Sequence, residues 1–348
     1  MTGRWTLPPL SEGELAPEFM APTRANPRFH FNTVAGRYVL LGFLPPAGPA
    51  RKAALADIAA HRARFNDRDL TGFLIVADAD FEVSPPDLIP GLRVFLDPAR
   101  EVRDAYGVET GWFLLDPGLR VMVRAPLDVA EPLFQRLATL PPPGAHAGVP
   151  LVAPVLVVPR VFTPDLCRRL IAYYDAEGGK ASGVMRDIEG RTVGVLDPMK
   201  SRKDVTVVAP ELKSEIIGAL QTCLLPMIAR TYHFSATRLE RYLIACYDAQ
   251  EGGYFRPHRD NLSMGTAHRK FAVSINLNAE DFEGGDLRFP EFGPRTYRPP
   301  TGGAVVFACG LLHEATPVTR GRRYAVLPFL YDEAGEEIRV RNRHLLDA

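Results

Sequence analysis

A proline-rich segment separates two parts of the chain that differ in character. Residues 140–154 read LPPPGAHAGVPLVAP, with three consecutive prolines and scattered glycine and alanine. Such a segment stiffens the backbone and offers little apolar surface to a core, which is typical of an interdomain linker. The length of 348 residues also suits about two domains. We therefore expect domains over residues 1–138 and 155–334, a linker over 139–154 and a C-terminal tail over 335–348.

The first part alternates strand-like and helix-like stretches. Continuous apolar runs such as YVLLGFL are typical of strands that are buried on both faces. The order of strand, helix, strand and hairpin predicts a mixed α/β domain. The expected strands are Tyr38–Leu44, Leu74–Ala77, Leu92–Leu96, Trp112–Leu115 and Leu119–Val123, and the expected helices are Arg51–Phe65 and Ala99–Tyr106.

The second part begins with helices and continues with short strands. Thr163 before Pro164 is a favourable helix start, because proline suits the first helical position. From Glu240 onward, short strands are separated by glycine-rich or polar turns, which predicts a sandwich or barrel. The expected helices are Thr163–Ala176 and Leu212–Tyr232, and the expected strands are Tyr242–Tyr247, Phe271–Leu277, Asp286–Phe289, Ala304–Ala308 and Tyr324–Leu330.

Composition excludes several classes of protein. Lys+Arg and Asp+Glu are both 41, so the formal net charge is zero, which argues against a general nucleic-acid binder. No uninterrupted apolar stretch is long enough to span a membrane, and the N-terminus lacks the apolar core of a signal peptide. The four cysteines are far apart and lack zinc-type spacing. We expect a cytoplasmic protein without a membrane or nucleic-acid partner.

The triplet His258-Arg259-Asp260 is the sharpest local motif. On a strand, residues i and i+2 project to the same face, so an imidazole and a carboxylate would converge there. His313 follows a later apolar strand and supplies a third donor. Two histidines and one carboxylate with open positions opposite are the facial arrangement of non-haem Fe(II) oxygenases. The triplet alone is a weak signal, because composition would place about 0.5 such triplets in this chain by chance.

Arg323 strengthens the motif. It lies ten residues after His313, at the start of the last expected strand. A guanidinium binds a carboxylate through two parallel hydrogen bonds, as the far end of a dicarboxylate co-substrate would require. The flanking Arg320 and Arg322 are interpreted as solvated turn charges.

The stretch Leu243–Leu330 resembles the catalytic core of the prolyl-4-hydroxylase-like branch of the 2-oxoglutarate and Fe(II)-dependent dioxygenases. The family order of H-x-D, a distal histidine and a basic residue about ten positions later is present. The resemblance implies an α+β domain with a double-stranded β-helix, or jelly roll. The matching pieces are LIACYDAQEGGYFRPHRD, SINLN, FEGGDLRFPE and PPTGGAVVFACGLLHEATPVTRGRRYAVLPF.

The same resemblance implies residue roles and chemistry. His258, Asp260 and His313 would bind Fe(II), and Arg323 would bind the distal carboxylate of 2-oxoglutarate. The implied reaction uses O2, releases succinate and CO2, and hydroxylates a prolyl residue, an amino acid or a peptide. Asp260 favours hydroxylation or desaturation over halogenation, for which relatives carry a small residue at this position. Ascorbate is implied as an additional reductant.

Three further residues match the family's co-substrate pocket. Tyr247 and Tyr254 correspond to tyrosines that line it, although ordinary aromatic core packing explains either residue equally well. Many relatives place a tyrosine or threonine on the strand that here is Phe271–Leu277. The inward candidates on that strand are Ser274 and Asn276, and Asn276 could donate a hydrogen bond to the co-substrate.

The first part resembles a peroxiredoxin of the thioredoxin fold. That family needs a thiolate in a P-x-x-x-T-x-x-C motif, but a motif started at Pro45 puts Pro49 at the threonine position and Lys52 at the cysteine position. The domain is therefore expected to be redox-inactive. Its expected role is structure, substrate recruitment, or contact with a partner protein or a second copy of the chain. The matching pieces are ELAPEF (14–19), GRYVLLGFLPP (36–46), VFLDPAREVRDAYGV (94–108) and FLLDPG (113–118).

Three alternatives to an active dioxygenase remain open. One is a binding or scaffold protein in which both domains have lost catalysis, and the second is a thiol peroxidase, which the missing cysteine argues against. The third is a cupin-type metal enzyme, which would not predict Arg323. The substrate is also open: the arginines around the site could favour an acidic substrate, but ordinary solvated charges are the preferred interpretation. The polar segment Ala181–Arg202 is a candidate substrate lid.

Overall fold

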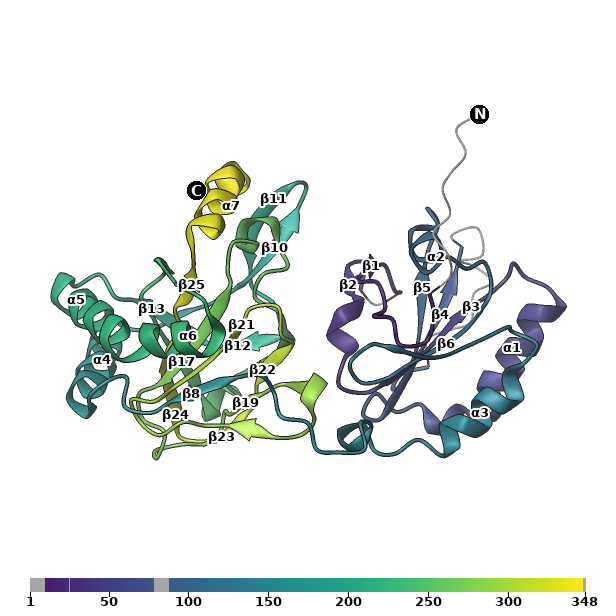
Figure 1. Ribbon diagram of the computed structural model, residues 1–348, viewed down its shortest axis with the longest axis horizontal. Coiled ribbons are helices and arrows are strands. Elements are labelled where there is room, and N and C mark those ends of the chain that lie inside the picture. The colour runs from purple at the N-terminus through teal and green to yellow at the C-terminus, as the bar shows by residue number, and fades with distance from the viewer. Residues whose placement is uncertain (1–9, 25, 78–87, 347–348) are drawn as a thin grey trace. The chain divides into compact units, whose positions relative to one another are not determined.

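The computed structural model describes residues 10–24, 26–77 and 88–346. The chain forms two compact units, which are residues 1–152 with 290–294 and residues 153–289 with 295–348 (Figure 1). The first nine residues, on which the expectation of no signal peptide partly rests, lie outside the described residues.

The N-terminal unit is built on a mixed five-stranded sheet with the order β5-β4-β3-β6-β7. The first three strands along the chain are parallel, and the last two form an antiparallel hairpin beside β3. This order of elements agrees with the mixed α/β domain expected from the sequence. The strands are β3 (Tyr38–Phe43), β4 (Leu70–Val76), β5 (Leu92–Leu96), β6 (Gly111–Leu115) and β7 (Val121–Ala125).

Helices and aromatic residues complete this unit. Trp112 and Phe134 meet edge to face in its core, with ring centroids 5.7 Å apart. Gly42 makes room for the indole, because a Cβ at Gly42 would lie 2.4 Å from the Trp112 ring. The helix expected over Arg51–Phe65 ends at Ala60 and is followed by a short 3-10 turn. The remaining elements are α1 (Pro49–Ala60), α2 (Glu101–Tyr106), α3 (Ala130–Ala138), β1 (Met20–Ala21) and β2 (Phe29–His30).

The C-terminal unit contains two antiparallel sheets, the arrangement of the expected jelly roll. The smaller sheet has the order β12-β16-β22-β19-β20, with β12 (Lys200–Ser201), β16 (Tyr254–His258), β22 (His313–Ala315), β19 (Leu287–Arg288) and β20 (Thr296–Tyr297). The larger sheet has the order β14-β25-β17-β24-β15-β13-β9, and β21 and β8 extend it beside β17. Its strands are β8 (Leu156–Val158), β9 (Lys180–Ala181), β13 (Lys203–Thr206), β14 (Arg238–Glu240), β15 (Leu243–Asp248), β17 (Phe271–Asn276), β21 (Ala304–Ala308), β24 (Arg322–Val326) and β25 (Phe329–Tyr331).

Two prolines break elements that the sequence predicted to be continuous. The expected strand Tyr324–Leu330 is divided into β24 and β25, because Pro328 cannot donate a ladder hydrogen bond. The expected helix Leu212–Tyr232 consists of α5 (Pro210–Ala219), a π-helical turn and α6 (Leu225–Tyr232). Pro226 lacks the N–H that would continue the α-helical pattern, which accounts for the wider turn before it.

The expected strand Asp286–Phe289 is reduced to the two residues of β19.

The helical segment Pro210–Tyr232 is long and apolar enough to cross a membrane by length and composition alone. It packs into the hydrophobic core of the unit through Ile216, Leu220, Leu224 and Ile228. The other helix of this core, α4 (Pro164–Glu177), starts as expected, because the Thr163 hydroxyl accepts a hydrogen bond from the Leu166 N–H at 3.2 Å.

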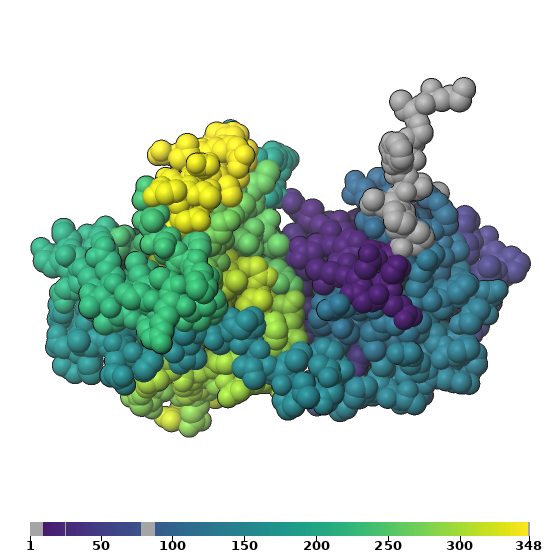
Figure 2. All heavy atoms as spheres, in the orientation of Figure 1, coloured from purple at the N-terminus to yellow at the C-terminus, as the bar shows by residue number. Residues whose placement is uncertain are grey.

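The segment expected to be a C-terminal tail is mostly helical. Helix α7 (Glu333–Asn342) is capped by Asp332, the residue before it, whose side chain accepts a hydrogen bond from the Gly335 N–H at 2.9 Å. Figure 2 shows this helix, in yellow, on the outside of the C-terminal unit. Residues 347–348 of the expected tail lie outside the described residues.

The candidate lid Ala181–Arg202 contains a β-hairpin of β10 (Val184–Ile188) and β11 (Arg191–Val195). The hairpin is fastened to the loop that follows the H-x-D triplet. The Met264 N–H donates to the Asp187 carboxylate and the Gly265 N–H donates to the Thr192 hydroxyl, both at 2.9 Å. The remaining short strands, β18 (Glu283–Gly284) and β23 (Val318–Arg320), pair with each other.

Candidate metal centre and co-substrate pocket

Neighbouring strands of the smaller sheet bring the three predicted ligands together. His258 is the last residue of β16 and lies directly opposite His313, the first residue of β22. Asp260 follows β16, and its backbone N–H donates to the Cys309 carbonyl at 3.0 Å. Strand pairing therefore unites residues that are 55 positions apart in the chain (313 − 258).

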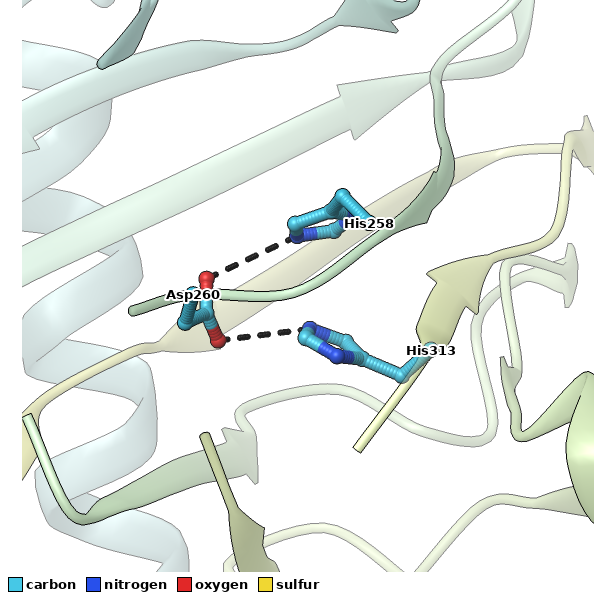
Figure 3. A group of neighbouring side chains, drawn as sticks. All are labelled: His258, Asp260 and His313. Carbon is cyan, nitrogen blue, oxygen red and sulfur yellow. Dashed lines mark ion pairs between the residues drawn. The ribbon is translucent and has the colours of Figure 1, made fainter. Parts of the chain in front are cut away.

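The three side chains converge on one point (Figure 3). The Asp260 carboxylate lies 3.6 Å from Nε2 of His258 and 3.3 Å from Nε2 of His313. The potential ligand atoms all lie within 4.8 Å of one another, which is close enough for one metal ion to contact all three. Each Nδ1 donates to a carbonyl two residues earlier, that of Arg256 at 2.8 Å and that of Leu311 at 3.0 Å. These bonds place the imidazole proton on Nδ1 and leave Nε2 free to bind a metal.

The electrostatics keep these groups in the protonation states that a metal requires. Burial, together with the nearby His313, lowers the pKa of His258 to about 4. Burial would raise the pKa of Asp260, but its interactions with His313 and His258 outweigh this and hold that pKa well below its usual range. A neutral imidazole and an ionised carboxylate are the forms that bind metals.

Arg323 is a buried cation for which the described residues supply no acidic partner. It lies on β24 opposite Tyr247, and only 2% of its surface is exposed. Its Nη2 donates to the Ser274 hydroxyl at 2.7 Å and its Nε donates to the Asn276 side-chain oxygen at 3.3 Å. Within the described part of the chain, Nη1 has no hydrogen-bond partner and no carboxylate forms an ion pair with this guanidinium. Burial, the largest cause, lowers the pKa of Arg323.

A buried and unpaired guanidinium is costly, so this arrangement fits a carboxylate that arrives with a ligand. Ser274 and Asn276 fix the orientation of Arg323 from the neighbouring strand β17. Asn276 also donates to the Pro299 carbonyl at 2.9 Å. In the structure the Asn276 side-chain oxygen thus holds Arg323 and its nitrogen binds the Pro299 carbonyl, while the contact with the co-substrate stays a prediction.

The two predicted tyrosines lie in different surroundings. The guanidinium of Arg323 lies over the Tyr247 ring at 5.2 Å from the centroid, and Tyr247 is buried. The Tyr254 hydroxyl instead donates to the Pro198 carbonyl at 2.6 Å, in the loop before β12. The structure thus places Tyr247, but not the hydroxyl of Tyr254, beside Arg323.

Sequence reasoning did not single out Arg202, which also contacts the pocket. Its Nη1 donates to the Tyr247 hydroxyl at 3.3 Å, while its Nε and Nη2 donate to the Asp204 carboxylate at 2.7 and 2.6 Å. Arg202 directly precedes β13 and Asp204 lies on it. Their R-x-D spacing could have predicted the pair, because alternate residues of a strand share a face.

Two histidines and one carboxylate that converge on one point are the ligand set of mononuclear non-haem iron oxygenases. The same unit also contains the buried cation Arg323. Residues 242–331 match the family model of the 2OG-Fe(II) oxygenase superfamily. The C-terminal unit therefore contains a 2OG-Fe(II) oxygenase domain, a family that implies Fe(II), 2-oxoglutarate and O2.

The curated relatives include several PKHD-type hydroxylases. One from Synechococcus sp. (strain JA-2-3B'a(2-13)) is 32% identical over 94 residues, covering 25% of this chain and 41% of the relative. One from Pseudomonas fluorescens is 37% identical over 91 residues, covering 24% and 39%. One from Idiomarina loihiensis is 24% identical over 180 residues, covering 50% and 75%. The chain thus spans less than half the length of the first of these relatives.

Solved structures that are similar to part of this chain include two prolyl hydroxylases. A Pseudomonas putida prolyl-4-hydroxylase has a TM-score of 0.40 at 21% identity, covering 52% of this chain and 93% of that one. A prolyl hydroxylase from Trichoplax adhaerens has a TM-score of 0.43 at 18% identity, covering 59% and 93%.

Proposed function

We propose that this protein is an Fe(II)- and 2-oxoglutarate-dependent dioxygenase that hydroxylates a prolyl residue, an amino acid or a peptide and releases succinate and CO2. The observation that carries the proposal is the buried, unpaired guanidinium of Arg323 in the same unit as the His258, Asp260 and His313 cluster. The names of the PKHD-type relatives support a hydroxylase.

The chain's own residues hold and orient the reactants. His258 and His313 would bind iron through Nε2, and Asp260 would bind it through its carboxylate. Arg323 would bind the distal carboxylate of 2-oxoglutarate, while Ser274 and Asn276 keep the guanidinium in place. When bound, Fe(II) and 2-oxoglutarate supply the O2 chemistry that oxidises a C–H bond. Ascorbate is proposed as a reductant on the resemblance alone.

Anaerobic titration of the metal-free protein tests this proposal. Addition of Fe(II) and then 2-oxoglutarate is expected to produce a visible metal-to-ligand charge-transfer band that saturates with the co-substrate. Succinate release in air would then identify substrates. The absence of a band in folded protein that takes up iron would contradict the proposal and favour the scaffold or cupin alternatives. The complete cluster and Arg323 already argue against a non-catalytic scaffold.

We propose further that the N-terminal unit is a redox-inactive thioredoxin-fold domain related to peroxiredoxins. The central position of β3 in a mixed sheet, followed by α1, supports this assignment. Lys52 lies in α1 where a peroxiredoxin carries its cysteine, and the first cysteine of the chain is Cys167. The full chain is therefore expected to consume hydrogen peroxide no faster than a variant with all four cysteines replaced. A cysteine-dependent peroxidase rate would refute the assignment.

The wider organisation is part of the same proposal. Residues 1–138 and 155–334 would be the two functional domains, joined by the linker 139–154, and residues 335–348 would be a C-terminal tail. The N-terminal domain would contact a partner protein or a second copy of the chain. We propose a cytoplasmic enzyme that acts on a small-molecule, peptide or protein substrate.

A further inference from the structure

Lys200 lies on the same sheet face as the metal cluster. On β12 it stands directly opposite Phe255 of β16, and its ammonium lies over the Phe255 ring, 5.1 Å from the centroid. The Phe255 ring in turn stacks on the imidazole of His258, with centroids 3.4 Å apart and an interplanar angle of 18°. One aromatic ring therefore separates the Lys200 ammonium from a predicted iron ligand.

The ammonium of Lys200 has only neutral hydrogen-bond partners. It donates to the Ser182 hydroxyl at 2.6 Å and to the Gly183 carbonyl at 2.7 Å. An ammonium has three N–H donors, so one of them has no partner among the described residues. The neighbouring carboxylate of Asp204 is engaged by Arg202 through two hydrogen bonds. Burial, reinforced by Arg202, lowers the pKa of Lys200 to about 6, although Asp204 and Asp260 act in the opposite direction.

When Lys200 carries its proton, nothing in the loaded site balances the added positive charge, which agrees with the lowered pKa. In the loaded site, Fe(II) contributes two positive charges and Arg323 contributes one. The two negative charges of 2-oxoglutarate and the one of Asp260 cancel them. The Arg202–Asp204 pair is neutral by itself. Nothing in this set favours the ammonium form of Lys200, whereas an anionic group bound beside it would raise the pKa and restore the charge.

Two of the five arginines that were candidates for an acidic substrate, Arg288 and Arg298, have acidic partners among the described residues. Arg288 pairs with Glu314, and Arg298 pairs with Asp286 at 2.5 Å. These pairs agree with the interpretation of the arginines as balanced charges. Lys200 differs from them, because it is half-buried, is separated from His258 by one aromatic ring and has no acidic partner among the described residues.

We propose that Lys200 binds a carboxylate of the substrate and thereby selects carboxylate-bearing substrates over neutral ones. This inference rests on the proposed function. Among the substrates considered above, it favours a free amino acid or a peptide that places a carboxylate next to the oxidised carbon. A charge-assisted hydrogen bond to the free N–H of the ammonium would supply the recognition.

A structural role for Lys200 must be separated from this one, because its two hydrogen bonds also fasten β12 to the residues before the hairpin. The Ser182→Ala variant removes one of these bonds and keeps the charge. Lys200→Met removes the charge and keeps most of the aliphatic stem. Lys200→Arg restores a cation. Lys203→Ala is the matched control. Lys203 lies on β13, the next strand along the chain, pairs with Glu251 and has a side chain that is 44% exposed.

The experiment is calorimetric titration of the full chain, loaded anaerobically with Fe(II) and 2-oxoglutarate, with a panel of N-acetyl amino acids and the corresponding amides. At least one acid is expected to bind about tenfold or more tightly than its amide. Lys200→Met should abolish that preference and Lys200→Arg should recover part of it, whereas Ser182→Ala and Lys203→Ala should keep it.

Three results would overturn the inference: no acid binds, acids and amides bind alike, or Lys200→Met keeps the preference. Weakening by Ser182→Ala to the same extent as by Lys200→Met would also overturn it, in favour of the structural role. Failure of the proposed function is distinguishable, because the wild-type protein would then lack the charge-transfer band before any probe is added.

Discussion

Replacing His258 by alanine is expected to abolish tight Fe(II) binding while the protein remains folded. The variant leaves only His313 and Asp260 as donors in a cluster whose ligand atoms lie within 4.8 Å of one another. Loss of a residue that merely supports a metal ligand typically costs 10–100-fold in affinity, so loss of a ligand itself should cost about 100-fold or more. Anaerobic Fe(II) titration, with circular dichroism as the check on folding, measures this loss.

The matched control is His344→Ala, which removes an exposed histidine from the turn after α7. It should bind Fe(II) as the wild-type protein does. Wild-type affinity in a folded His258→Ala variant would show that the cluster is not the iron site. An equal loss in both variants would show that the effect is not specific to the cluster.

Replacing Arg323 by alanine is expected to leave Fe(II) binding intact and to weaken 2-oxoglutarate binding severely. The variant lacks the guanidinium, so the distal carboxylate of 2-oxoglutarate would lose its charge-assisted contact and would be buried without a partner. Truncating one member of such a buried pair costs about 2–5 kcal/mol, or roughly 30- to 4,000-fold in affinity. The 2-oxoglutarate concentration that gives half of the maximal charge-transfer band measures this effect at saturating Fe(II).

Arg322→Ala controls for a change of charge on the same strand, because its side chain is 57% exposed and pairs with Asp248. It should shift the 2-oxoglutarate requirement little. Arg323→Lys should recover part of the affinity, since it keeps the charge but loses the planar fork. A normal 2-oxoglutarate requirement in Arg323→Ala would remove this residue from the co-substrate pocket.

The metal cluster could be predicted from sequence because its spacing carries the geometry. His258 and Asp260 are two residues apart, a spacing that predicts convergence on a strand. In the structure β16 ends at His258, and Asp260 lies in the turn after it, where its backbone N–H binds the Cys309 carbonyl. Arg323 stands out by its spacing from His313 and by the family resemblance; the structure shows it buried, and its binding of a co-substrate stays a prediction. The strands β15 and β21 could be predicted from their apolar runs, because both are buried in the larger sheet and therefore consist mostly of apolar residues.

Lys200 and Arg202 could not be found in this way. They approach the site because β12 pairs with β16 and because Arg202 reaches Tyr247 on β15. Such pairings join segments far apart in the chain, and neither residue belongs to an apolar run that would mark its strand. Similarly, Tyr254 matched a family position, but the neighbouring loop at Pro198 determines where its hydroxyl binds.

The Nδ1 bonds of His258 and His313 have a consequence for the kinetics and thermodynamics of metal uptake. Each imidazole is held by a carbonyl only two residues away, so both rings are oriented before the ion arrives. The loss of rotamer freedom has already occurred during folding. The cluster is thus preorganised: iron need not rearrange the ligands, and reversible loss of the ion should leave the folded scaffold ready to be reloaded.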